Sequence, residues 1–266
     1  MNRSTPRWAR FTLAAYGVCA VLAGLGLLGA RWQQGADRAE HLPPGSGAWL
    51  GTDQLGRDIA AMTAQGAWTA FVMGGLAAGG ATLIGALLGM SSGWRPGWWD
   101  RFALWLSAAV SAIPGILLIL VIAAAMGPGL PALIVAIAAV SWVSVYRLVR
   151  AETRRLRDEE FVQTALAQGE SSASVLLRHL TPHVLPVVLV QFGLAFVGAI
   201  QAEAVLSFLG LGAPEHASWG RMIAEAWTWD DLGHGRWWRL TAASLALGGL
   251  AISVLAISRS GERRRA

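Results

Sequence analysis

Residues 68–93, WTAFVMGGLAAGGATLIGALLGMSSG, contain no charged side chain. A helix needs about 20 apolar residues to cross a hydrocarbon core of about 30 Å. Backbone N–H and C=O groups at that depth must bond within their own segment, as they do in a helix. The stretch therefore predicts a membrane-spanning helix and places the chain in the all-α class.

Similar apolar runs lie on both sides of this stretch. The first apolar run of the chain, residues 11–30, is longer than the apolar core of a secretory signal, which is usually about 7–15 residues. A retained helix is therefore expected there. The chain is thus predicted to be a polytopic membrane protein with about six transmembrane helices and a cytoplasmic helix. The predicted spans are residues 11–30, 68–93, 102–126, 131–146, 184–211 and 240–257.

The span positions divide the chain into three parts. Residues 1–67 form a cytoplasmic tail, the first helix and an outer loop, and residues 68–258 form a transmembrane core. Within the core, residues 147–183 form a cytoplasmic loop, here called the coupling loop. Residues 259–266 form a short basic tail.

Composition supports a membrane class and limits other functions. Hydrophobic residues make up 55% of the chain, charged residues 14%, and mean hydropathy is +0.49. The net charge is +5, and all of the residues counted as Lys or Arg are arginines. These arginines lie between apolar blocks, which argues against a nucleic-acid partner. Cys19 is the single cysteine, so an internal disulfide is excluded.

The distribution of arginine predicts the orientation. Positively charged loops remain on the cytoplasmic side. Most of the 21 arginines fall in the N-terminal tail, the coupling loop and the other inner segments, if both termini are cytoplasmic. The outer loops then hold Arg31, Arg38, Arg57, Arg221, Arg236 and Arg239.

Small residues and one proline indicate how the helices pack. Gly75 with Gly79, and Gly85 with Gly89, have the spacing that lets two helix backbones approach closely. We interpret this as packing within the chain, with homodimerisation as the alternative. Pro114 removes a backbone donor from the third span and predicts a kink. That kink either shapes a pathway or aids packing.

The coupling loop has the pattern of helix, break, helix. Residues 158–168 are rich in helix formers, Gly169 is a natural stop, and Ser171 or Ser172 can cap a second helix that runs to about residue 180. Pro182 and Pro186 are expected to bracket the start of the fifth span.

The first of these helices predicts a docking face. Phe161 and Ala165 are four residues apart, so one aromatic side chain is expected to project beside a small one. Such a face suits the groove of a partner protein. An amphipathic helix resting on the membrane surface remains the alternative.

Several motifs in order carry a family resemblance. EFVQTALAQG at 160–169, with RHLTP at 178–182, is similar to the EAA coupling motif of bacterial ATP-binding-cassette (ABC) importer permeases. GTDQLGRD at 51–58, SFLGLG at 207–212 and SWG at 218–220 resemble the C-type permeases of dipeptide, oligopeptide and nickel importers. The likeness extends from about residue 51 to residue 224.

The resemblance implies a type I ABC importer permease in the bacterial inner membrane. The implied partners are a homologous permease forming a heterodimer, two cytoplasmic ATPases that bind ATP and Mg²⁺, and an extracytoplasmic substrate-binding protein. Peptide is the expected cargo, and nickel or another small solute is the alternative.

The resemblance also assigns the contact with the ATPases. Glu160, Phe161, Ala165 and Gly169 match the motif, and Gln163 lies in the same helix. The chain departs from the family pattern at Gln163, Thr164, Leu166 and Gln168, and His183 replaces a common Asn. The C-terminal tail also lacks the customary family ending.

The residue content argues against other chemistries. A Walker A loop needs a lysine, which the chain lacks, so no ATPase site and no cofactor of its own are expected. An intramembrane hydrolase is the rival class, but neither Gly-x-Ser-x-Gly nor His-Glu-x-x-His occurs. His216 and His234 share one outer loop and are interpreted as solvated, with no metal site expected.

Glu203 is the acidic residue placed firmly within a predicted span. A charge at membrane depth is costly unless it pairs or faces water. Glu203 is therefore a candidate for the pathway or gate, together with Pro114, and structural pairing of Glu203 is the alternative.

Overall fold

The computed structural model describes residues 6–29, 32 and 38–262, with side chains up to residue 258. The predicted end of the first span at residue 30, and residues 1–5 and 263–266 of the tails, lie outside this part. The described elements are helices, which confirms the all-α class. They are α1 (Arg7–Gly24), α2 (Ile59–Trp94), α3 (Trp98–Ser111), α4 (Gly115–Met126), α5 (Leu130–Arg157), α6 (Glu160–Ala167), α7 (Ser172–Ser174), the π-helix η1 (Val175–Leu180), α8 (Thr181–Phe208), α9 (Trp219–Thr228) and α10 (Trp238–Glu262).

Within the described residues, four helical segments are long and apolar enough to cross a membrane. They are α2, α5, α10 and the continuous run from Ser172 to Phe208 that includes α8. A fifth is the pair α3 and α4, if the bent pair counts as one span. α1 occupies the remaining predicted segment but does not meet the same criterion, because Arg7 and Arg10 within its 18 residues lower its hydropathy.

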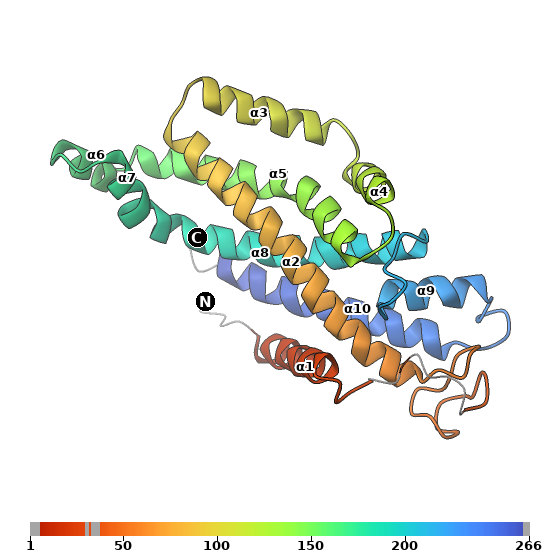
Figure 1. Cartoon of the computed structure of the whole chain (residues 1–266). Helices are drawn as coiled ribbons and strands as arrows, with labels where there is room; N and C mark the ends of the chain where they lie inside the picture. The colour runs from red at the N-terminus through yellow and green to blue at the C-terminus, as the bar shows by residue number, and fades with distance from the viewer. Residues whose placement is uncertain (1–5, 30–31, 33–37, 263–266) are drawn as a thin grey trace.

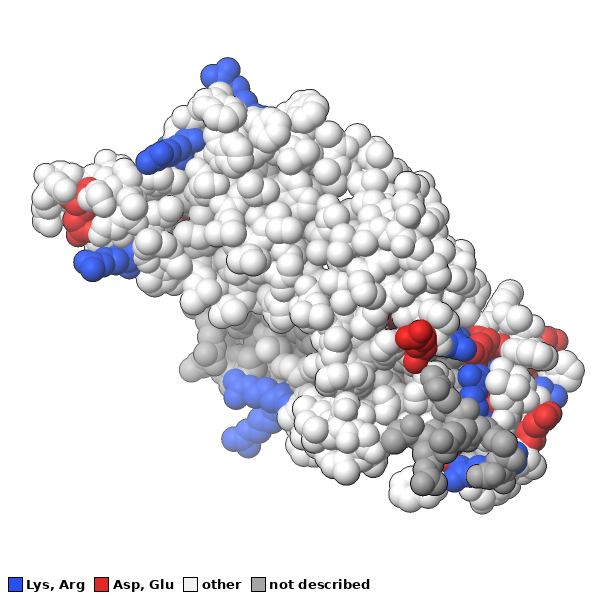
Figure 2. Space-filling view, in the orientation of Figure 1, with Lys and Arg blue, Asp and Glu red and all other residues white. Residues whose placement is uncertain are grey.

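The helices form an elongated bundle with different structures at its two ends. α2 runs along the bundle and packs against α1, α5 and α8 (Figure 1). The turn of α6 and α7 projects at one end, and α9 lies with residues 38–58 at the opposite end (Figure 1). On the face shown in Figure 2, charged side chains lie toward the two ends and the edges, and leave a broad uncharged surface between them.

Glycines on α2 bring its backbone against α5. A Cβ added at Gly85 would lie 2.6 Å from Cβ of Val145, and one at Gly89 would lie 2.9 Å from the carbonyl oxygen of Tyr146. Gly93, one turn further, is equally close to α5. The predicted Gly85 and Gly89 spacing is therefore confirmed as a packing contact within the chain.

The prediction for the other glycine pair is wrong. Added Cβ atoms at Gly75 and Gly79 would meet nothing within 4 Å. The close contact on this part of α2 is made by Gly74, where a Cβ would lie 2.9 Å from the Ile200 side chain on α8. One residue turns a helix by about 100°, so spacing alone did not identify the face that packs.

An ion pair joins three helices at the end of α2 near α3. Arg150 of α5 donates to both carboxylate oxygens of Asp100 on α3, at 2.5 and 2.7 Å. Ser92 of α2 donates to the same carboxylate at 2.5 Å. Asp100 is buried, and two-point bonding to a guanidinium fixes geometry as well as charge. Arg150 lies on α5, which continues as one helix past residue 146, the predicted end of the span.

The kink predicted at Pro114 is confirmed as a break between two helices. α3 ends at Ser111 and α4 begins at Gly115, with an angle of 86° between them. Arg147 of α5 donates to Oγ of Ser111 at 2.7 Å, at the C-terminal end of α3. A cation at that position complements the negative end of the helix dipole and stabilises the bend.

The glycine contact makes a direct prediction about stability. Gly85→Leu should destabilise the protein by roughly 1–3 kcal/mol or more, because its side chain would overlap α5. Gly79→Leu, on the same helix, faces open space and should have little effect on unfolding. Thermal unfolding of both purified variants in detergent tests this, and equal destabilisation would contradict the assignment of the packed face.

Candidate functional site

The coupling loop has the helix, break, helix structure that its sequence predicts. α5 ends at Arg157, and α6 covers residues 160–167. Gly169 then adopts a φ of +88°, a conformation that favours glycine. Ser171 caps the next helix by accepting a hydrogen bond from the Ser174 N–H at 3.2 Å.

The second helix of the coupling loop does not stop where predicted. α7 passes through the π-helix η1 directly into α8, and Pro182 and Pro186 lie within the first turns of α8. Proline offers no N–H to the helix and its ring clashes with a carbonyl one turn earlier. The wider turn accommodates this, and the carbonyl of Leu176 accepts both the N–H and the hydroxyl of Thr181.

The inner face of α6 packs on η1 and α5. Val162 is fully buried and Ala165 is 6% exposed. They belong to a cluster of buried apolar side chains that includes Val175 and Leu180 of η1 and Leu156 of α5. This cluster holds the short α6 helix against the long helices that follow and precede it.

The outer face of α6 differs from the prediction in one respect. Phe161 is 38% exposed, and Glu160, Gln163 and Gly169 are exposed as well. Ala165, expected beside Phe161 on the docking face, points inward instead. The two side chains are separated because the inner face needs a small residue where α6 meets η1. Gln163 donates to the carbonyl of Arg157 at 2.9 Å, which ties α6 to the end of α5.

A polar contact closes the break between α6 and η1. Nε2 of His179 lies 3.2 Å from both carboxylate oxygens of Glu170, and the Ser174 hydroxyl donates to the same carboxylate at 3.0 Å. The hydrogen bond from Ser174, followed by that from His179, lowers the pKa of Glu170. Glu170 therefore stays ionised and accepts both bonds.

Glu203 is buried in α8, far from the coupling loop. It is 7% exposed and accepts a hydrogen bond from Ser207 at 2.6 Å. The Ser207 hydroxyl also lies 3.5 Å from that of Ser218, the N-cap of α9. In the part of the chain with described side chains, no cation forms an ion pair with Glu203. Its partners are hydroxyl groups near the junction of α8 and α9.

The SFLGLG and SWG motifs shape that junction. Gly210 has a φ of +84° and turns the chain after α8. A Cβ at Gly220 would lie 2.4 Å from Cα of Ala204, so only glycine lets α9 cross α8 this closely. The indole of Trp219 donates to the carbonyl of Thr63 on α2 at 3.0 Å. The two motifs thus lock α9 across the ends of α8 and α2.

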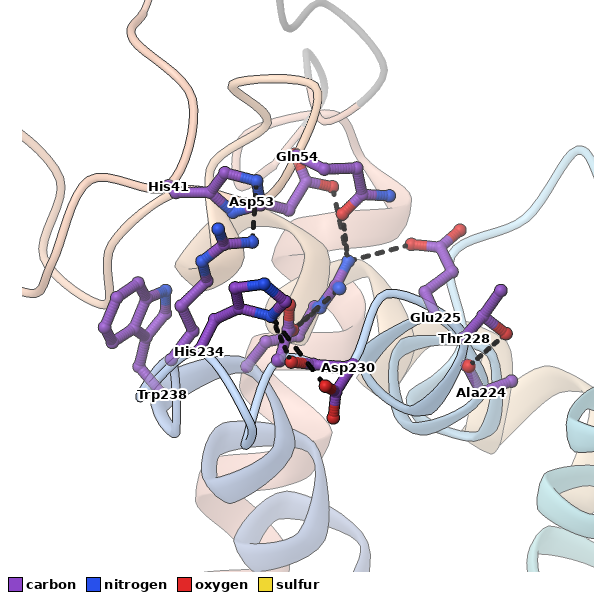
Figure 3. A network of polar contacts seen from close by, with 12 residues as sticks. His41, Asp53, Gln54, Ala224, Glu225, Thr228, Asp230, His234 and Trp238 are labelled. Carbon is purple, nitrogen blue, oxygen red and sulfur yellow. Dashed lines mark hydrogen bonds and ion pairs between the residues drawn. The ribbon is translucent and has the colours of Figure 1, made fainter.

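Buried charges connect the loop before α2 with α9 and α10 (Figure 3). Arg57 donates to Asp53 and to Glu225 of α9, both at 2.6 Å. Arg239, at the start of α10, is 1% exposed and pairs with Asp231 at 2.7 Å. Arg239 also bonds to Gln54 and lies 3.5 Å from Glu225. The arginine positions in the sequence did not predict this network, because its members are brought together only by the fold. We call this group the outer network, after the loops that the arginine distribution predicts to lie on the outer side: Asp53, Gln54, Arg57, Arg221, Glu225, Asp231 and Arg239.

Two further contacts join the same loops. Arg236 donates to Nε2 of His41 at 2.9 Å, and the indole of Trp238 donates to the carbonyl of Thr52 at 3.2 Å. Burial and then the Arg236 guanidinium lower the pKa of His41. The neutral imidazole can accept the hydrogen bond from Arg236. These contacts tie the loop before α2 to the start of α10.

Comparison with known proteins assigns the family. Residues 81–265 match the family described as "binding-protein-dependent transport system inner membrane component". The chain belongs to this family. It is therefore a multi-pass membrane protein and a permease component of a transport system.

Relatives of the permease have more specific names. A protein of Brucella suis biovar 1 (strain 1330), whose name describes a peptide transport system permease, is 34% identical over 86% of this chain and 75% of its own. The dipeptide transport system permease protein DppC of Bacillus subtilis (strain 168) is 35% identical over 76% of this chain and 62% of its own. The glutathione transport system permease protein GsiD of Escherichia coli O1:K1 / APEC is 36% identical over 67% of this chain and 59% of its own.

The outer network of the permease predicts which charges its stability needs. Arg239→Ala would leave buried carboxylates without their guanidinium and should cost roughly 3–5 kcal/mol. The exposed pair of Arg38 and Asp58 at the same end is a matched control, and Arg38→Ala should cost less than about 1 kcal/mol. Unfolding of the two variants in detergent measures the difference. Similar losses of unfolding free energy in both variants would show that the network does not depend on Arg239.

Proposed function

We propose that this permease forms half of the translocation pathway for peptides in an ABC importer. Its partners are a homologous permease, two cytoplasmic ATPases and an extracytoplasmic substrate-binding protein. The observation that carries the proposal is the exposed Phe161 on a short helix joined to a membrane-spanning helix, in a chain whose relatives are named for peptide transport. The transport cycle alternates access to the two sides of the membrane.

The geometry of the coupling loop supports ATPase docking. α6 is anchored by buried Val162 and presents Phe161, Glu160 and Gln163 outward. A partly exposed aromatic side chain on a rigid element is a typical anchor for a protein interface. Because α6 packs on η1, and η1 runs without a break into α8, a displacement of α6 can be transmitted to a membrane-spanning helix.

The charge distribution supports an orientation with the coupling loop and both termini in the cytoplasm. Arg147, Arg150, Arg154, Arg155, Arg157 and Arg178 all lie in this loop. Positively charged loops of this kind stay inside. ATP is hydrolysed by the partner ATPases, since the chain contains no lysine for a phosphate-binding loop.

Phe161→Ala tests the docking role. Loss of an aromatic anchor should reduce peptide uptake and peptide-stimulated ATP hydrolysis by roughly tenfold or more, with normal membrane insertion. Both activities are measured in proteoliposomes that contain the permease with its own partners and binding protein. Leu177→Ala serves as the control, because Leu177 is also exposed in the loop but lies on η1. Uptake that is unchanged by Phe161→Ala would remove Phe161 from the dock.

We assign Glu203 and Pro114 to the outer gate and the pathway. Glu203 is a buried carboxylate near the junction of α8 and α9, and Pro114 begins the bend between α3 and α4. A carboxylate at membrane depth is costly, which supports a role beyond packing. The bend at Pro114 lets α4 run across the direction of α3.

Glu203→Gln separates the charge of this residue from its hydrogen bond. The amide oxygen can still accept from Ser207, so assembly should be preserved. Uptake should fall severalfold if the carboxylate acts in the gate. The measurement is uptake across a range of pH, with assembly followed by size-exclusion chromatography. Normal uptake at every pH would leave Glu203 as a structural acceptor alone.

A further inference from the structure

The exposed aromatic side chain of α6 does not stand alone. The ring of Phe161 stacks on the imidazole of His183, with 5.1 Å between ring centroids and 28° between planes. His183 lies in the first turn of α8. One face of Phe161 is therefore supported by the membrane-spanning helix itself, and the rest of its exposed surface is free for a partner.

A backbone contact fixes the orientation of the His183 ring. Nδ1 of His183 lies 2.8 Å from the carbonyl oxygen of His179. A carbonyl oxygen can only accept, so Nδ1 donates, and the imidazole plane is set by the helix. An exposed histidine without this bond would sample several rotamers.

The backbone beneath His183 is also held in place. Buried Leu180 and Val184 flank this turn and pack into the apolar cluster under α6. His179, whose carbonyl accepts the bond, is itself tied to Glu170 through its ring at 3.2 Å. The His183 ring that contacts Phe161 is thus held in place by the first turn of α8 and by the preceding turn of η1.

We propose that His183 is a positioning residue for ATPase docking. Its ring holds Phe161 in one exposed orientation before the ATPase binds, which reduces the ordering cost of the interface. The same ring contact couples a displacement of Phe161 to α8. The inference rests on the proposed docking role of Phe161 and adds to it a residue outside the matched part of the coupling motif.

A double-mutant cycle tests the inference in the complete complex. The four proteins are the original permease, His183→Ala, Phe161→Ala and the double variant, each assembled in nanodiscs with the partner permease. Affinity for the purified ATPase subunits and peptide-stimulated ATP hydrolysis are measured. His183→Ala should weaken ATPase binding by about 2- to 10-fold, the range expected for an aromatic pair, and should have no further effect when Phe161 is already Ala.

Two more variants separate positioning from a general structural role. His183→Phe keeps a flat aromatic ring but loses the bond to the His179 carbonyl, so it should recover part of the ATPase affinity lost in His183→Ala. Leu185→Ala removes an exposed side chain from another face of the same turn and should bind normally. Rescue by phenylalanine would not be expected if His183 acted only through its hydrogen bond.

The outcomes distinguish failure of this inference from failure of the proposed function. If Phe161→Ala binds the ATPase normally, the docking role of Phe161 fails and the inference fails with it. If Phe161→Ala weakens binding but the effects of the two substitutions add, docking stands and positioning by His183 is overturned. Equal losses in His183→Phe and His183→Ala would overturn it as well.

Discussion

The contact between α2 and α5 depends on the absence of side chains at Gly85, Gly89 and Gly93. There the backbone of one helix lies against the other, with no room for even a methyl group at any of the three positions. Membrane helices gain little from apolar burial relative to lipid, so dispersion contacts at short range provide much of their attraction. α2 and α5 thereby form a common axis for the bundle.

This axis connects the two ends of the molecule. α2 begins directly after its N-cap Asp58, in the loop that carries the outer network, and ends beside the Asp100 ion pair. α5 passes that ion pair and continues into the coupling loop. Each end is thus built on polar contacts that fix where a long apolar helix starts or stops. The middle of the bundle, which must face lipid and partner helices, is held together by close packing of helix surfaces.

Sequence patterns predicted the features that depend on neighbouring residues. Apolar runs located the long helices, Pro114 located the bend, and Gly169 with Ser171 located the break in the coupling loop. Features that depend on distant residues were not predictable in this way. Arg57 and Glu225 are separated by 168 positions, and only the packing of α9 across α8 brings them together.

The faces of helices were equally hard to predict, for a related reason. Small residues occur all around α2, so the neighbours of α2 and not its own spacing decide that Gly74 packs and Gly75 does not. Ala165 likewise turned inward because η1 lies there. Phe161 and Gln163 of the predicted coupling site are exposed as expected, whereas the support from His183 required knowledge that α6 folds back on α8.

The burial of the outer network has a consequence for ionic strength. Its charged members are three carboxylates and three arginines, so it carries no net formal charge, and its central groups lie beyond the reach of mobile ions. At physiological concentration, dissolved salt largely screens interactions between exposed charges more than about 8 Å apart, and it screens buried pairs much less. The contact of Glu170 with His179 at the other end is partly open to solvent. The two ends of one helical bundle therefore differ in their sensitivity to the surrounding electrolyte, with the outer end the more insulated of the two.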